Sequence, residues 1–84
     1  MTGELRIHDV QSVQVNDEYL YLVVDGQSYR VSWADCSPAL AHATQAQRSH
    51  MIVAPSGYGI HWPELDEDLA ITPLLQSAQA LSAA

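Results

Sequence analysis

The fold is decided by the stretch Gly57-Tyr-Gly-Ile-His-Trp-Pro-Glu-Leu-Asp-Glu-Asp-Leu69, which combines aromatic, aliphatic, acidic and turn-forming residues within thirteen positions. Alternation of side chains along a strand predicts that Tyr58, Ile60 and Trp62 point to one face, with Trp62 as the anchor of the core. Pro63 is expected to end this strand because proline has no N–H to donate to a neighbouring strand.

The opposite face of the same strand is predicted to carry Gly59 and His61. A glycine at this place allows another part of the chain to approach closely. Beyond the proline, the chain is expected to make a short exposed connection, with Leu65 pointing back inward, before it returns to the core at Leu69. That connection would carry four carboxylates: Glu64, Asp66, Glu67 and Asp68.

Outward from this stretch, the N-terminal half predicts a three-stranded antiparallel meander. Apolar and polar residues alternate over 13–15, and residues 19–24 and 29–33 are rich in aromatic and β-branched side chains. Asp25-Gly26 is a strong indication of a two-residue hairpin turn. The facing pairs are then Val24–Gln27, Leu22–Tyr29 and Leu20–Val31, and the core face carries Leu20, Leu22, Val24, Tyr29, Val31 and Trp33.

The first connection of the meander lies around Asn16-Asp17. We expect two or four residues there, because a three-residue loop would turn Val13 and Val15 away from the core. The reverse face of the meander combines polar and apolar residues and is expected to be partly exposed to water. It carries Tyr19, Tyr21, Val23, Ser28, Arg30 and Ser32.

Helix-forming patterns follow the meander. Ser37-Pro38 predicts a helix start, since serine caps free backbone N–H groups and proline suits the first helical position. Thr44 is a second candidate cap, so the segment forms either two short helices or one bent helix. Residues 51–53 and 58–62 then predict a second β-hairpin.

Thr72-Pro73 repeats the capping pattern and predicts a C-terminal helix that continues as a helical tail over 76–84. Its apolar stripe would be Leu74, Leu75, Ala78 and Leu81. A chain of 84 residues is long enough for one modest core. The sequence therefore predicts a small single α+β domain over 1–84.

The composition is strongly acidic, with ten carboxylates, three arginines and no lysine, and a formal charge of −7. Direct binding to nucleic acid or to an anionic membrane is not expected, because both require clustered basic side chains. A basic protein would be attracted instead. Cys36 is the single cysteine, and neither a secretory signal nor a transmembrane segment is visible in the sequence, so a cytoplasmic location is expected.

The central stretch supports three hypotheses. His61 and two of the carboxylates could bind a metal, although the spacing matches no known ligand motif. The acids could support acid–base catalysis, but four carboxylates in an exposed loop favour solvation, and Cys36 has no identifiable catalytic partner. In the third hypothesis, the stretch presents an acidic surface to a protein partner. A simpler interpretation of any one carboxylate is that it caps backbone N–H groups in a turn.

Several blocks of the sequence resemble one bacterial family. They are the Asp25-Gly26 hairpin with the strand that follows it, Ala43-Thr44-x-x-Gln47-Arg48, the whole block from Gly57 to Leu69, and Leu74-Leu75. Together they are similar to the family known as domain of unknown function 2442, over roughly Val13 to Leu75. The resemblance implies a small cytoplasmic α+β domain with an antiparallel sheet and no established enzyme activity.

The same resemblance implies a partner. Members often stand beside a small gene proposed to encode a toxin, and on that basis they have been suggested to be antitoxin-like. Some relatives carry an added helix-turn-helix domain, which residues 1–84 do not include, so a role in DNA binding is not expected.

Taken together, these patterns predict a protein–protein interaction module rather than an enzyme, with no cofactor and no metal, that binds a basic and toxin-like neighbour-encoded partner. Formation of a homo-oligomer is a further possibility, because an uncovered strand edge could pair with a second copy. The predicted interaction surface consists of Tyr58, His61, Trp62, Glu64, Asp66, Glu67 and Asp68. The alternative is a small metal- or ligand-binding module that uses His61 and the acidic segment.

Overall fold

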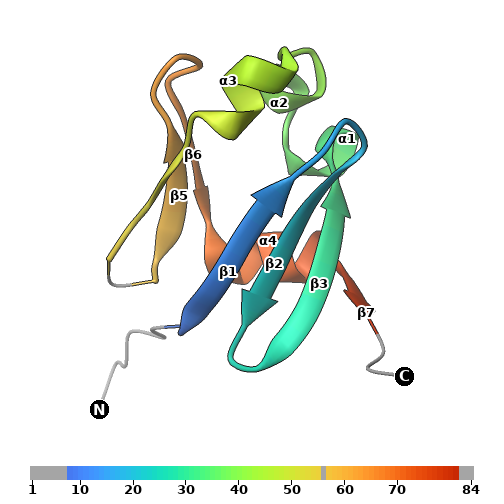
Figure 1. The fold of residues 1–84 in the computed structure, drawn as a ribbon, viewed down its shortest axis with the longest axis vertical. Coiled ribbons are helices and arrows are strands. Elements are labelled where there is room, and N and C mark those ends of the chain that lie inside the picture. The colour runs from blue at the N-terminus through green and yellow to red at the C-terminus, as the bar shows by residue number, and fades with distance from the viewer. Residues whose placement is uncertain (1–7, 56, 82–84) are drawn as a thin grey trace.

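The computed structural model describes residues 8–55 and 57–81. These residues form two antiparallel sheets, with strand orders β1-β2-β3-β7 and β4-β5-β6, together with short helices (Figure 1). The elements are β1 (Val10–Val15), β2 (Tyr19–Val24), β3 (Gln27–Ser32), α1 (Trp33–Cys36), α2 (Pro38–Ala41), α3 (Gln45–Ser49), β4 (Ile52–Val53), β5 (Gly59–Trp62), β6 (Glu67–Ala70), α4 (Ile71–Ser77) and β7 (Gln79–Leu81). Within the described residues, none of the helices has the length and apolar character needed to span a membrane.

The predicted meander is confirmed in its register. The facing pairs are Val24–Gln27, Leu22–Tyr29 and Leu20–Val31. Asp25 and Gly26 have positive φ angles of 52° and 83°, which is the geometry of a type I′ turn. The Gln11 side chain accepts a hydrogen bond from the Gly26 N–H at 2.7 Å and so braces the turn.

The first connection also follows the prediction. Val15 faces Leu20, so four residues lie between the paired positions, and the valines of β1 stay on the core side. The Asn16 side chain accepts backbone hydrogen bonds from Glu18 and Tyr19, each at 2.8 Å. This is an Asx-type turn, the local conformation in which asparagine is favoured.

The helical segment resolves into separate short helices. Ser37 caps α2 by accepting from the Leu40 N–H at 3.1 Å, and Thr44 caps α3 in a reciprocal capping box with Gln47. Trp33, predicted to end a strand, instead begins α1. The reason is local, since the Ser32 hydroxyl caps the Asp35 N–H and starts a helical turn at Trp33.

The predicted C-terminal helix is present, but the prediction that it continues as a helical tail is wrong. Helix α4 begins at Ile71, with Ala70 and not Thr72 at the N-cap, and it ends at Ser77. Residues 79–81 form β7, which pairs with β3 through Ser28–Leu81, Tyr29–Ala80 and Arg30–Gln79. An open strand edge offers unpaired backbone groups, and the last residues satisfy them better as a strand than as another helical turn. The rest of the predicted tail, residues 82–84, lies outside the described residues.

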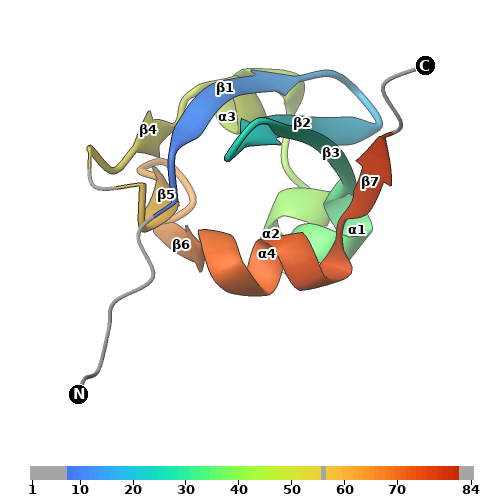
Figure 2. The same cartoon turned by 90° about the horizontal axis from the view of Figure 1, so that it is seen from below.

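The elements enclose one hydrophobic core (Figure 2). Seen from below, β1, β2 and β3 form one side of a ring, α4 lies opposite, and the small sheet β4-β5-β6 closes the flank. The buried hydrophobic side chains that form it are Leu20, Leu22, Val24, Val31, Trp33, Leu40, Ile60, Trp62, Ile71 and Leu74.

Two indoles hold the sheets and helices together at the centre of this core. Trp62 is 0% exposed and meets Trp33 edge to face, with ring centroids 6.4 Å apart. The Trp62 Nε1–H donates to the Arg48 carbonyl at 2.9 Å, and the Trp33 Nε1–H donates to the Asn16 carbonyl at 2.8 Å. Trp62 is therefore the core anchor that the sequence predicts.

Candidate functional site

The acidic segment is more ordered than the sequence predicts. Glu67 and Asp68 belong to strand β6, where they pair with Trp62 and His61, so only residues 63–66 form the connection. Asp66 adopts a left-handed conformation with φ of 49°, and its N–H donates to the Pro63 carbonyl at 3.3 Å. This tight turn brings β6 directly back along β5, because no longer loop is needed.

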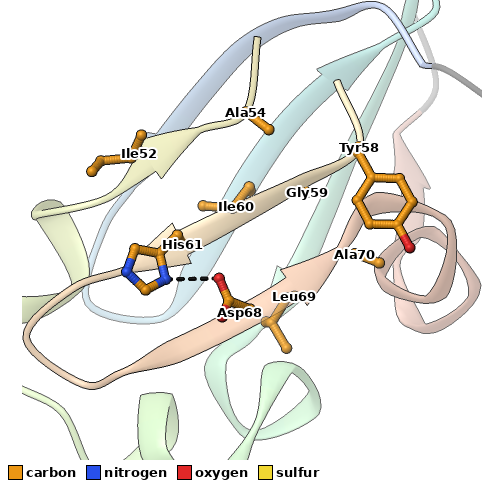
Figure 3. A pocket seen from close by; sticks show the side chains of 9 residues that line it. All are labelled: Ile52, Ala54, Tyr58, Gly59, Ile60, His61, Asp68, Leu69 and Ala70. Carbon is orange, nitrogen blue, oxygen red and sulfur yellow. Dashed lines mark hydrogen bonds and ion pairs between the residues drawn. The ribbon is translucent and has the colours of Figure 1, made fainter. Parts of the chain in front are cut away.

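The small sheet has an inner face and an outer face. On β5, Ile60 and Trp62 point inward and are buried, whereas Gly59 and His61 lie on the outer face. The outer face holds a hollow of about 300 Å³ (Figure 3), which we call the outer groove. It is lined by Ile52, Ala54, Tyr58, Gly59, Ile60, His61, Asp68, Leu69 and Ala70.

Gly59 allows β6 to lie close against β5 beneath the outer groove. A Cβ atom at this position would lie 2.7 Å from the Leu69 carbonyl oxygen. The two strands could not keep their present separation with any larger residue, and the close backbone approach expected from the sequence is confirmed.

Two large apolar side chains flank the outer groove, and both are exposed to solvent. Tyr58 is 61% exposed and Ile52 is 54% exposed, and they are the exposed large hydrophobic residues of the described chain. In Figure 3 they lie at opposite ends of the groove. Exposed apolar side chains that border one groove make it a candidate contact surface.

The predicted position of Tyr58, on the same face as Ile60 and Trp62, is wrong. Strand β5 begins only at Gly59, because Gly57 has a φ of +73° and interrupts the alternation just before it. The Tyr58 carbonyl still accepts from the Ile71 N–H at 2.8 Å. The core at this end of the strand is occupied by Ile71, which is fully buried, so the tyrosine ring turns outward.

One histidine–carboxylate pair crosses the outer groove between β5 and β6. His61 Nδ1 lies 2.7 Å from Asp68 Oδ1, and the Asp68 side chain is 77% exposed. Because a carboxylate accepts hydrogen bonds, the ring nitrogen facing it carries the proton. Asp68 Oδ2 has no hydrogen-bond partner among the described residues.

The remaining predicted residues are not gathered in the outer groove. Glu64 reaches His50 at the end of α3, with Oε2 2.8 Å from Nδ1, and Asp66 is exposed on the turn. Glu67 is half-buried and paired with Trp62 on the inward side of the sheet. Trp62 supports the surface from within the core. Tyr58, His61 and Asp68 are thus the predicted residues that the fold brings together.

The described arginines are engaged elsewhere. Arg48 donates to the backbone carbonyls of Leu40, Ala41 and Asp17 at 3.0 to 3.1 Å, and its guanidinium lies 4.9 Å from the centre of the Trp33 ring. The Arg30 guanidinium stacks on Tyr19, with its carbon 4.5 Å from the centre of the ring. The guanidinium hydrogens of Arg48 are thus taken by these backbone carbonyls and not by the acidic segment.

Sequence reasoning missed two features. Ile52 faces His61 across β4 and β5, which places it on the outer face, and the register of the second hairpin would have revealed this. His8 bridges Asp25 Oδ2 and Thr72 Oγ1, each at 2.9 Å. No sequence pattern connects residues so far apart, and the bridge ties the residues before β1 to the hairpin turn and to α4.

The nucleophile and metal-ligand chemistry of the described residues is limited. Burial, reinforced by the nearby Asp35 charge, raises the pKa of Cys36 to about 12, so its thiol stays protonated near neutral pH. No group of three or more histidine, cysteine, aspartate or glutamate side chains converges within the described part of the chain. His61 and Asp68 together would supply two metal ligands.

Comparison with known proteins gives one match. A family model described as "Protein of unknown function (DUF2442)" matches residues 10–80. Neither the curated proteins nor the solved structures gave a significant match to the chain.

Proposed function

The chain belongs to the DUF2442 family, whose function is unknown, and we propose that it is a protein-interaction module that binds a basic partner through the outer face of β4-β5-β6. The observation that carries the proposal is the exposure of Ile52 and Tyr58 at the two ends of the outer groove. Elsewhere in the described chain, the large apolar side chains are at least partly buried.

Charge supports the choice of partner. The protein carries a formal −7, and Glu64, Asp66 and Asp68 are exposed on β6 and the turn before it. Carboxylates at the rim of an apolar surface attract basic partners and repel acidic ones. A small basic protein encoded by a neighbouring gene, as the antitoxin-like hypothesis holds, fits this chemistry.

A binding role fits the site better than catalysis. Apart from the Tyr58 hydroxyl, the polar side chains of the outer groove are His61 and Asp68, which already bond to each other. The cysteine is protonated and lies outside this groove. A pair of side chains that lies largely open to water lacks the enclosed environment that general acid–base catalysis requires.

The test is co-purification with the product of the adjacent gene. The unaltered protein is compared with the double variant Ile52→Ser, Tyr58→Ser, at about 0.1 M and about 1 M salt, where the screening length falls from about 10 Å to about 3 Å. We expect a complex that weakens at high salt and is lost in the double variant. Tyr21→Ser, on the outer face of the larger sheet, is the matched control and should leave the complex intact.

Two results would contradict the proposal. One is the absence of a complex at either salt concentration. The other is a complex that the double variant forms as tightly as the unaltered protein.

A further inference from the structure

We propose that the outer groove receives one arginine side chain of the partner, with its aliphatic stem over Gly59 and its guanidinium on Asp68. This assignment rests on the proposed function, because it specifies what the outer face of the small sheet recognises. It follows from three properties of the groove: its size, its apolar floor and the Asp68 carboxylate oxygen that His61 does not bind.

The size of the outer groove suits one long side chain. Its volume of about 300 Å³ is at the lower limit of small-molecule pockets. Gly59 and Ala70 pair across β5 and β6, and these two small residues lie between Tyr58 and the His61–Asp68 pair. Gly59 and His61 are two residues apart, which is about 7 Å along a strand, a distance that an arginine stem and its guanidinium can span.

The lining favours a side chain with an apolar stem and a charged tip. Ile52, Ala54, Tyr58 and Ala70 offer carbon surface, on which the methylene groups of an arginine can lie while its charged end stays in water. A guanidinium is also planar and presents two parallel N–H donors to a carboxylate, which the compact lysine ammonium cannot do. Tyr58 lies at the other end of the floor from Asp68, where its ring offers carbon surface to the stem.

Asp68 is placed to bind the tip. His61 holds Oδ1 at 2.7 Å and so orients the carboxylate, while Oδ2 has no hydrogen-bond partner among the described residues. The described arginines do not bind it, because Arg30 is engaged with Gln79 at 3.0 Å and Arg48 with backbone carbonyls. The carboxylate therefore remains available to a cation from outside.

The experiment is an NMR titration of the amide signals with three blocked peptides, acetyl-Ala-X-Ala-amide, where X is arginine, citrulline or lysine. Citrulline has the shape of arginine without its charge. We expect the arginine peptide to shift the signals of Gly59, His61, Asp68 and Ala70. It should bind about two to five times more tightly than the citrulline peptide, the range of an exposed ion pair, and more tightly than the lysine peptide.

Two variants separate a specific contact from general attraction to an acidic protein. In Asp68→Asn, the arginine and citrulline peptides should bind equally. In Asp17→Asn, which removes the same charge from the exposed connection between β1 and β2, the preference for arginine should persist.

The inference is overturned if arginine binds no better than citrulline or lysine, if the shifts map to another surface, or if Asp68→Asn keeps the preference. The co-purification test distinguishes this failure from failure of the proposed function. If the complex is lost in the Ile52→Ser, Tyr58→Ser variant while the peptides show no preference, the outer face is still the binding surface and only the assignment of arginine is rejected.

Discussion

The two faces of strand β5 differ in what they contribute, although their residues alternate along four positions. Ile60 and Trp62 face inward and are almost completely buried, and the Trp62 indole also bonds to the Arg48 carbonyl. Gly59 and His61 face outward, where the glycine lets β6 approach closely and the histidine holds a carboxylate. The difference teaches that one short strand can separate stability from recognition, so variants on the two faces should affect different measurements.

The largest expected effect is on the inner face. Trp62→Ala should lower the free energy of unfolding by about 3–5 kcal/mol, because it opens a cavity and leaves the Arg48 carbonyl without its donor. Urea unfolding followed by circular dichroism measures the change. His61→Ala, one residue away on the outer face, is the control and should change stability by at most about 1 kcal/mol. Equal losses in the two variants would refute the division between the faces.

Gly59→Ala should be an outer-face variant that does lower stability, because the added Cβ meets the Leu69 backbone carbonyl oxygen at 2.7 Å. We expect a loss of about 1–3 kcal/mol in the free energy of unfolding, measured by the same unfolding experiment. Gly26→Ala is the comparison, since its φ of +83° with open space around it gives strain without a clash. Asparagine, which tolerates this conformation, should recover stability at position 26 but not at position 59.

On the outer face, Tyr58→Ser should leave the free energy of unfolding within about 0.5 kcal/mol of the original value. It should weaken binding of the partner by about 10-fold or more, since an aromatic ring within a contact surface carries a large share of the binding energy. Calorimetric titration with the purified partner measures the affinity. A stability loss comparable to that of Trp62→Ala would show that this ring belongs to the core after all.

The smallest effect is expected for Asp68→Asn. Removing one exposed carboxylate should change stability by less than about 1 kcal/mol and should mainly slow association with a basic partner, because rim charges steer the encounter. Association rates at about 0.1 M and about 1 M salt should differ less in this variant than in the unaltered protein. An unchanged salt dependence would place the steering charges elsewhere.

The sequence predicts the larger sheet well because its determinants are local. Asp25-Gly26 sets one turn type, that turn sets the register, and the register sets which residues of β2 and β3 are buried. The caps at Ser37 and Thr44 are likewise read from neighbouring residues. Trp62 is predictable as a core residue because its strand alternates clearly.

The outer groove is harder to predict because it depends on contacts between distant residues. Ile52 reaches the groove through its pairing with His61, and the exposure of Tyr58 depends on the backbone conformation of Gly57. The β7 strand forms because the edge of β3 is available in space, which no pattern near residues 79–81 records. The acidic character of the surface can therefore be predicted from the sequence, whereas the apolar floor beside the acidic residues cannot.

The pairing of β7 with β3 has a consequence for synthesis of the protein on the ribosome. Strand β3 is made about fifty positions before the residues that cover its outer edge, so a nascent chain exposes that edge until residues 79–81 have emerged. A chain cut before this point would leave the edge open to pairing with another nascent copy. Emergence of residues 79–81, rather than closure of the hairpins, is the step that covers this edge of the larger sheet.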